Sequence, residues 1–95
     1  MVELKPGQLV RSLAGRDKGK HYLVLRELDQ RTVLLVDGRS RPLSRPKKKN
    51  KAHLQHYDRR VKLGEALDVN SINDSQVIRA IKELISDSGF SEGEV

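Results

Sequence analysis

The stretch Gln8-Leu-Val-Arg-Ser-Leu-Ala-Gly-Arg-Asp-Lys-Gly-Lys-His-Tyr-Leu-Val-Leu25 decides the fold class of this chain. Its first part, Gln8–Ala14, alternates between two faces as a β-strand does, and a second strand is expected over His21–Leu28. The loop between them is rich in turn signals, because Gly15 and Gly19 adopt positive φ angles at low cost. Two short strands joined by such a loop indicate antiparallel β structure.

The next segment predicts a third strand and the end of the regular sheet. Asp29–Arg31 has the length of a hairpin loop, and Thr32–Val36 is apolar on both faces, as expected for a central strand. Asp37-Gly38 then predicts a turn. Prolines limit Arg39–Pro46 to an edge strand at best, since proline cannot donate a ladder hydrogen bond.

A basic loop and a closing strand are expected after the prolines. Lys47-Lys-Lys-Asn-Lys51 is a block of like charge that no core would accept, so we place it in a basic loop of about residues 39–53. His53–Asp58 alternates well enough to form one more short strand. This strand is expected to close the sheet into a small antiparallel barrel.

One helix is expected in the last third of the chain. Asn73 has the position of an N-cap, and Gln76 follows it at the spacing of a capping box. Ile72 and Val77 stand where a hydrophobic staple would lie, and Gly89 is expected to end the helix. Apolar residues recur at helical spacing along one stripe at Val77, Ile78, Ile81, Leu84 and Ile85. This stripe needs a partner surface, which the barrel supplies.

The whole chain is therefore predicted to be one mainly β domain with one C-terminal helix. Its 95 residues are 36% hydrophobic, enough for a small core. We expect the barrel over residues 1–62, a linker and a packed helix over residues 63–90, and a frayed tail over residues 91–95. No apolar run reaches the ~20 residues of a membrane span and no signal peptide is evident, so a soluble intracellular protein is expected.

Charge is distributed unevenly along the chain. The formal net charge is +6, but Arg39–Lys62 holds ten basic residues and one acidic, whereas Leu63–Val95 holds two basic and seven acidic. A concentrated basic segment indicates a polyanion bound by one part of the molecule. With only three aromatic residues, base stacking is disfavoured, and we expect contacts to the phosphates and the shape of a nucleic acid, which charge alone does not identify as RNA or DNA. A membrane surface is disfavoured because the prolines interrupt any amphipathic helix.

Several kinds of chemical site are disfavoured. Gly15-Arg-Asp-Lys-Gly-Lys20 lacks the spacing and the Ser or Thr of a nucleotide-binding phosphate loop. The chain has no cysteine, and His53 and His56 point to opposite faces of a strand, so no metal site is expected. Asp68–Asn73 departs from a calcium loop at a ligand and at the glycine. No catalytic motif is present, so neither enzymatic activity nor a cofactor is expected.

The segment Pro6-Gly-Gln-Leu-Val-Arg-Ser-Leu-Ala-Gly-Arg-Asp-Lys-Gly-Lys20, followed by Tyr22-Leu-Val-Leu25, resembles a KOW motif. Asp37-Gly-Arg39 and Arg45-Pro-Lys-Lys-Lys-Asn-Lys-Ala-His-Leu54 are similar to the small KOW ribosomal proteins of the archaeal and eukaryotic large subunit, and to short bacterial KOW proteins that bind RNA. The resemblance covers about residues 5–57. It implies an SH3-like barrel that binds RNA, usually ribosomal RNA, and catalyses nothing.

The resemblance also implies which residues contact RNA. Gly15 matches the loop glycine of the motif, with Gly19 as a second structural glycine. Arg16, Lys18 and Lys20 match its RNA-facing charges. The basic segment of the family is matched by Arg45, Lys47, Lys48, Lys49, Asn50, Lys51 and His53. Beyond the resemblance, the predicted RNA-binding set also contains the basic residues Arg11, Arg39, Arg41, Arg59 and Arg60.

We therefore expect a cytoplasmic, ribosome-associated protein, monomeric when free, that binds large-subunit ribosomal RNA, with ribosomal proteins or translation factors as further partners. The acidic C-terminal third differs from the basic tails of the ribosomal proteins and favours a transient role. Two alternatives stay open. In the first, the chain is a protein-interaction module that docks on a translation or transcription factor. In the second, its acidic end covers the basic loop and inhibits the binding of RNA.

Overall fold

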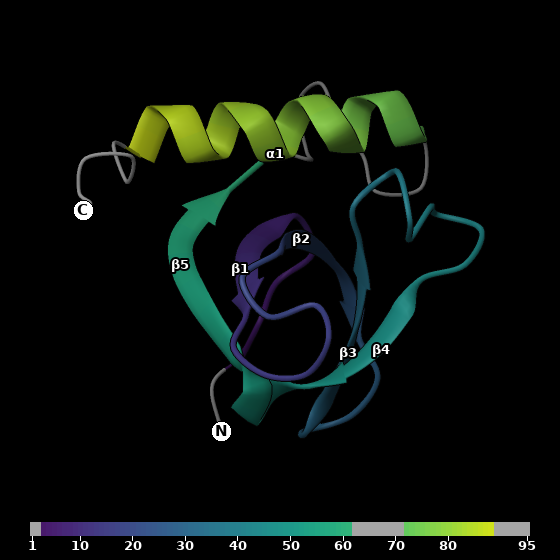
Figure 1. The fold of residues 1–95 in the computed structure, drawn as a ribbon, viewed down its shortest axis with the longest axis vertical. Helices are drawn as coiled ribbons and strands as arrows, with labels where there is room; N and C mark the ends of the chain where they lie inside the picture. Colours follow the sequence, from purple (N-terminus) through teal and green to yellow (C-terminus); the bar gives the residue numbers. More distant parts are fainter. Residues whose placement is uncertain (1–2, 62–71, 89–95) are drawn as a thin grey trace.

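The structure is a computed structural model that describes residues 3–61 and 72–88. Within these ranges it contains a five-stranded antiparallel sheet and one α-helix, which lies across one side of the sheet (Figure 1). In chain order the elements are β1 (Gln8–Ser12), β2 (His21–Glu27), β3 (Thr32–Val36), β4 (Lys47–Asn50), the 3₁₀ helix η1 (Lys51–His53), β5 (Leu54–Arg60) and α1 (Asp74–Ser88). The predicted mainly β fold with one C-terminal helix is confirmed.

The connection between β4 and β5 shows why the sheet curls into a barrel. The strand order is β4-β3-β2-β1-β5, so β4 and β5 occupy opposite edges. In a flat sheet these edges would lie about 19 Å apart, at roughly 4.8 Å per strand. The three residues of η1 rise only about 6 Å at the 3₁₀ spacing of about 2 Å per residue. The sheet must therefore bend until its two edges approach one another, as Figure 1 shows.

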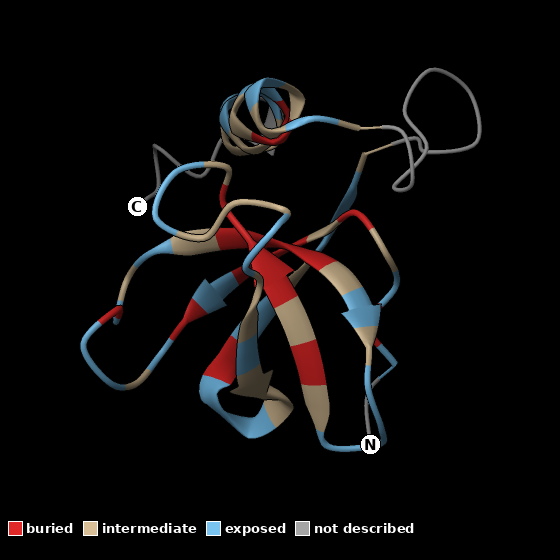
Figure 2. Ribbon diagram, turned by 90° about the vertical axis from the view of Figure 1, so that its right-hand side faces the viewer, coloured by how far each residue is buried: buried red, intermediate tan, exposed pale blue. Residues whose placement is uncertain are grey.

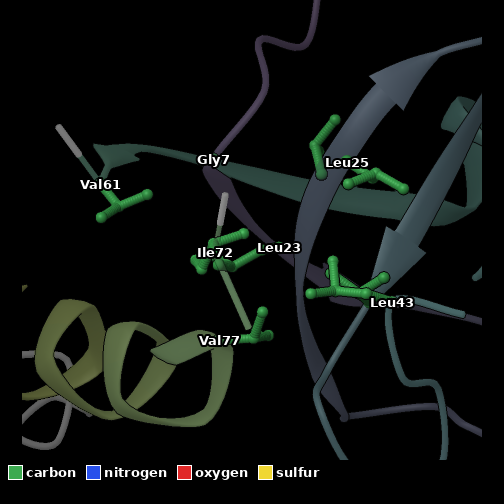
Figure 3. A pocket seen from close by; sticks show the side chains of 9 residues that line it. Gly7, Leu23, Leu25, Leu43, Val61, Ile72 and Val77 are labelled. Carbon is green, nitrogen blue, oxygen red and sulfur yellow. The ribbon is translucent and has the colours of Figure 1, made fainter. Parts of the chain in front are cut away.

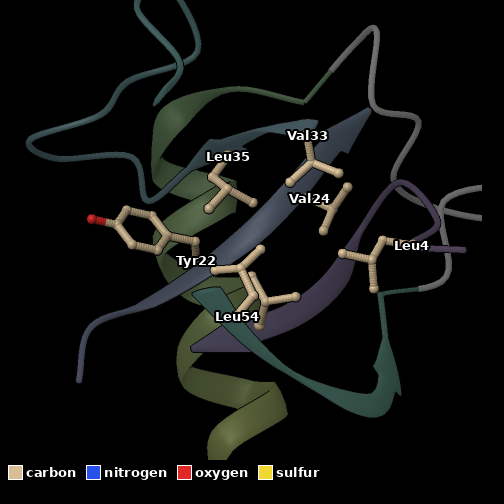
Figure 4. Close-up of a cluster of buried hydrophobic side chains, with 7 residues drawn as sticks. Leu4, Tyr22, Val24, Val33, Leu35 and Leu54 are labelled. Carbon is tan, nitrogen blue, oxygen red and sulfur yellow. The ribbon is translucent and has the colours of Figure 1, made fainter. Parts of the chain in front are cut away.

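The barrel interior is filled by one apolar cluster (Figure 4). Its buried members are Leu4, Val10, Tyr22, Val24, Val33, Leu35 and Leu54. Tyr22 and Val24 lie two residues apart on β2 and share the inner face, as the strand period of two requires. The ring of Tyr22 joins the cluster, while its hydroxyl group points away from the other labelled side chains.

A second apolar layer lies between the outer face of the sheet and α1. Leu23 and Val36, which are paired across β2 and β3, pack with Val77 and Ala80 of the helix. Figure 2 shows the buried part of α1 facing the sheet. The layer is tight: a cavity of only about 10 Å³, shown in Figure 3, remains among its apolar side chains. A volume this small is at the limit for one water molecule, so the layer is structural.

The start of α1 forms as the sequence predicts. The Asn73 side chain accepts a hydrogen bond from the Gln76 backbone N–H at 2.9 Å, and the Gln76 side chain accepts one from the Asn73 N–H at 2.8 Å. This is a complete capping box. Ile72 and Val77 both belong to the apolar layer, as a hydrophobic staple requires. The predicted terminator Gly89 and the tail over residues 91–95 lie outside the described residues.

The helix also depends on a close approach at Gly38. This residue has a φ angle of 80°, and a Cβ atom built on it would lie 2.5 Å from the Asp74 carbonyl oxygen and 2.8 Å from Ile78 Cγ1. Only glycine fits such a space at positive φ. The Asp74 carboxylate also accepts a hydrogen bond from the Leu43 backbone N–H at 2.8 Å. The turn after β3 therefore fixes the first turn of α1.

Some predicted boundaries are wrong. The predicted basic loop of residues 39–53 contains a strand, because Lys47–Asn50 pairs with β3 as edge strand β4, whereas residues 39–46 form turns and bends. A lysine run is tolerated there because one carboxylate from a distant segment, that of Asp17, pairs with both Lys47 and Lys49. The last strand is also longer than predicted and runs over Leu54–Arg60, while β1 ends at Ser12 and β2 at Glu27.

Candidate nucleic-acid interface

The order of the strands brings two basic loops to one end of the sheet. Strand β2 begins at His21, and β3 ends at Val36 beside Leu23 in an antiparallel pair. The loop that precedes β2, residues 13–20, therefore emerges next to the loop that follows β3, residues 37–46. A hydrogen bond of 3.0 Å from Lys20 Nζ to Ser40 Oγ joins the two loops directly.

The two loops border an open groove of about 440 Å³ at this end of the barrel, which we call the cationic groove. Its lining residues are Arg16, Asp17, Lys20, Tyr22, Ser40, Arg41, Arg45 and Lys47. Five of these side chains are basic and one is acidic. Positive charge in a concave surface with a low-dielectric wall focuses the field and attracts anions.

Asp17 organises the first of the two loops. Its buried carboxylate accepts hydrogen bonds from Ser12 Oγ at 2.8 Å, Tyr22 Oη at 3.0 Å and Lys49 Nζ at 3.0 Å. Lys47 Nζ lies 3.5 Å from the same group. Burial by itself raises the pKa of Asp17, but the hydrogen bonds from these neighbours outweigh it and hold that pKa well below its ordinary value. Asp17 therefore stays ionised and ties its loop to β1, β2 and β4.

The same network acts on Tyr22. Burial and the neighbouring Asp17 carboxylate raise the pKa of the Tyr22 hydroxyl well above its ordinary value. The hydroxyl therefore remains protonated and donates to Asp17. Because the ring is buried in the barrel and its hydroxyl is engaged, Tyr22 offers no open face for stacking on a nucleobase.

Asp37 organises the second loop in a similar way. Its carboxylate accepts hydrogen bonds from the Arg39 and Arg41 backbone N–H groups, both at 2.8 Å, and from Ser40 Oγ at 3.0 Å. Burial raises the pKa of Asp37, and these hydrogen bonds lower it by more, so the group is ionised. This turn fixes the backbone from which Arg39 and Arg41 project. Lys20 Nζ lies 3.5 Å from Asp37 and ties the two loops together a second time.

Some of the predicted RNA-binding residues are already bound to another group of the protein, and we call these committed. Others have no such partner among the described residues, and we call these uncommitted. Lys49 is bound to Asp17, and Lys51 donates to the Glu27 carboxylate, so both help to hold the barrel together. The hydrogen bonds from Lys51 and from the Leu4 backbone lower the pKa of Glu27. Asn50 accepts from the Ala52 N–H and caps η1. Within the described ranges, no ion-pair or hydrogen-bond partner binds the guanidinium groups of Arg16, Arg41 and Arg45.

The other predicted residues lie outside the cationic groove. Exposed side chains near its two loops and along the adjoining strands belong to Arg11, Lys18, Arg39, Lys48 and His53. Arg59 and Arg60 lie at the far end of β1 from the loop of residues 13–20, because Arg60 pairs with Gln8. There they line a separate depression of mixed charge together with Glu3, Lys5 and Asp58. The structure thus does not join all the predicted cations into one surface.

Sequence reasoning did not identify the acidic residues of this surface. Asp17 lies between Gly15 and Gly19, two residues from each, and Asp37 directly precedes Gly38, which is a signal for loop structure only. Their roles as anchors depend on Lys49 and Lys20, whose proximity is set by the folded sheet. Among the described residues, no group of three or more histidine, aspartate or glutamate side chains is placed to hold a metal ion. The described helix lacks the length and apolarity to cross a membrane.

In comparisons with known proteins, no family model matches this chain and no curated protein matches it. The resemblance to KOW proteins therefore rests on the residues quoted above.

Proposed function

We propose that this protein binds structured RNA through its cationic groove, which holds the sugar-phosphate backbone. The observation that carries the proposal is the meeting of two basic loops around one concave surface. Arg16 comes from the first loop, and Arg41 and Arg45 come from the second. Their guanidinium groups are uncommitted within the described ranges and present planar, bidentate donors that suit phosphate oxygens.

The anchoring carboxylates support this proposal. Each loop is held by several hydrogen bonds to a buried aspartate, so the backbone that carries the arginines is ordered before RNA arrives. Ordering in advance reduces the entropy lost on binding. Asp17 and Asp37 are themselves neutralised by lysines and by hydrogen bonds, so they subtract little from the attraction of the groove for an anion.

The groove favours recognition of backbone and shape over recognition of base sequence. Its aromatic residue, Tyr22, is buried, and arginine and lysine contacts to phosphate carry no sequence information. A folded RNA with closely spaced phosphates is the ligand that suits such a surface. The resemblance to KOW ribosomal proteins supports large-subunit ribosomal RNA as the class of RNA and the cytoplasmic ribosome as the location, and the acidic C-terminal third supports a transient association.

A salt titration tests the electrostatic mechanism. The affinity for a fluorescein-labelled RNA hairpin is measured by anisotropy at increasing concentrations of KCl. If all five basic side chains of the groove neutralise phosphates, the logarithm of affinity falls against the logarithm of salt with a slope of about −3.5 to −4.5. A slope near zero contradicts the proposal.

A pair of charge-matched variants tests the location. Arg16→Gln/Arg41→Gln/Arg45→Gln removes the uncommitted arginines and should reduce the steepness of the slope by about 2 to 3. The control removes three exposed arginines that do not line the groove, Arg26, Arg31 and Arg79, and should leave the slope nearly unchanged. Equal reductions of the salt slope in the two variants would show that the affinity for RNA depends on net charge alone. Sedimentation of both variants with ribosomal subunits then tests the ribosomal assignment.

A further inference from the structure

The helix α1 has more apolar surface than its contact with the sheet requires. Val77 and Ala80 are buried against the sheet. Ile78 and Ile85 lie on an adjoining side of the helix and stay partly exposed, with Ile81 between the two sides. Ile78, Ile81 and Ile85 follow i, i+3 and i+7 spacing, so they form a continuous stripe along one helix face.

This stripe forms one wall of a second groove, which we call the helix groove. Its volume is about 280 Å³, and the facing wall comes from the ends of the two loops, with Lys20 and Arg39 among its residues. The absence of a side chain at Gly38 allows the turn to approach Ile78 this closely. Lys20 also lines the cationic groove, so the two grooves are neighbours.

The charge around the helix groove is positive. Lys20, Arg39 and Lys82 are exposed at its rim. The acidic lining residue is Asp37, which is buried and already accepts hydrogen bonds from its own turn. The groove therefore combines an apolar wall of isoleucines with a cationic rim, and the residues of α1 that line it are three isoleucines and Lys82.

We propose that the helix groove binds a short segment of a partner protein that carries apolar side chains flanked by carboxylates. Apolar side chains gain free energy by covering the isoleucine stripe, and carboxylates pair with the cations of the rim. RNA suits this surface less well, because aliphatic isoleucines offer neither donors nor aromatic faces to a nucleotide. The inference does not depend on RNA binding. If both ligands bind, Lys20 places the partner directly beside the RNA.

Selection of short random peptides displayed on phage against the full chain tests this proposal without a known partner. The peptide enriched most strongly is synthesised with a fluorescein label, and its affinity is measured by anisotropy without RNA. We expect enriched peptides to combine apolar residues with Asp or Glu. Failure to enrich any peptide above a blank surface, or enrichment of basic peptides, overturns the proposal.

Variants then locate the site. Ile78→Ser/Ile85→Ser should weaken the selected peptide at least about tenfold, whereas Arg41→Gln/Arg45→Gln in the cationic groove should leave its affinity within about twofold. Unchanged affinity in the isoleucine variant overturns the proposal. If circular dichroism shows that this variant unfolds, Arg39→Glu/Lys82→Glu decides, because both positions are exposed.

The charge-reversal variant also gives a positive test. It should bind a version of the peptide with lysines in place of its carboxylates more tightly than the unmodified chain does, and it should reject the original peptide. Equal binding of both peptides to both proteins excludes the cationic rim as the recognition element. A concentration-dependent dimer that Ile78→Ser/Ile85→Ser abolishes would assign the groove to a second copy of the chain and would also overturn the proposal.

Discussion

Replacing Asp17 with asparagine preserves the shape of the side chain and removes the charge that holds the Lys49 side chain of β4. In the folded protein the Asp17 and Lys49 side chains are only 9% and 10% exposed, and their charged atoms lie 3.0 Å apart. After the substitution, Lys49 Nζ keeps a hydrogen bond to the Ala14 carbonyl oxygen but loses its counter-ion. A poorly hydrated ammonium group without a counter-ion is costly.

The expected loss of stability follows from this geometry. Removing one partner of a buried ion pair costs about 3–5 kcal/mol. We expect a value near the lower limit, about 3 kcal/mol, because the remaining carbonyl contact and the neutral amide of asparagine compensate in part. A domain of this size has a total free energy of unfolding of about 5–14 kcal/mol, so the loss is large.

Urea unfolding followed by circular dichroism measures the change, with Asp29→Asn as the control. Asp29 is an exposed aspartate whose partners, Arg31 and Thr32, lie only two and three residues further along the chain. Its replacement should lower the free energy of unfolding much less than Asp17→Asn does, because the exposed side chain is hydrated and asparagine keeps an oxygen that accepts the same hydrogen bonds. Lys49→Met completes a double-mutant cycle with Asp17→Asn, and we expect a coupling energy of about 2 kcal/mol. Costs that simply add in the double variant, or a loss below about 1 kcal/mol for Asp17→Asn, would refute the assignment of Asp17 as the anchor of its loop.

Other expectations follow from the same structure. Folding lowers the pKa of Asp17, so its ionised carboxylate stabilises the protein fully above about pH 5, and this contribution is lost as the pH falls toward the folded pKa. In acid, the unmodified chain should therefore lose free energy of unfolding more steeply with pH than Asp17→Asn does. The same dependence on pH for both proteins, measured by urea unfolding, would contradict this. Gly38→Ala should lower the free energy of unfolding by about 2–4 kcal/mol, because the residue has a positive φ and a Cβ atom would clash with Asp74. Gly15→Ala also has a positive φ, 85°, but the nearest neighbouring atom would lie 3.6 Å from the Cβ atom, so this change should cost only about 1–2 kcal/mol. Similar unfolding midpoints for the two variants would count against the close approach of the helix to Gly38. Asn73→Ala should cost about 1 kcal/mol in thermal unfolding, and no change would show that the capping box does not hold the helix.

The local elements of this fold could be predicted because their signals lie within a few residues. Alternating residues identify β1, the continuous apolar run Tyr22–Leu25 identifies β2, and the capping box at Asn73 identifies the start of α1. In each case the stabilising contacts join near neighbours or follow a short period. The outcome of these predictions therefore did not depend on how the chain folds over longer distances.

The strand β4 could not be predicted for the opposite reason. Judged locally, Lys47–Asn50 is a block of like charge that disfavours a strand. In the structure it is an edge strand, because Asp17 neutralises two of its lysines from 30 and 32 residues away along the chain. No local pattern marks that aspartate as their partner. A charge run is unfavourable in a sheet only as long as no counter-ion is brought to it.

The amino-acid sequence alone determined that this protein forms a mainly β domain with a C-terminal helix and that its excess positive charge follows Gly38. Tertiary structure decided which of those charges are available to a ligand. The curled sheet brings Asp17 to Lys49 and Glu27 to Lys51, while Arg16, Arg41 and Arg45 are left around a shared groove. The physical reason is that pairing between charges depends on distance in space, and strand order and barrel closure set those distances.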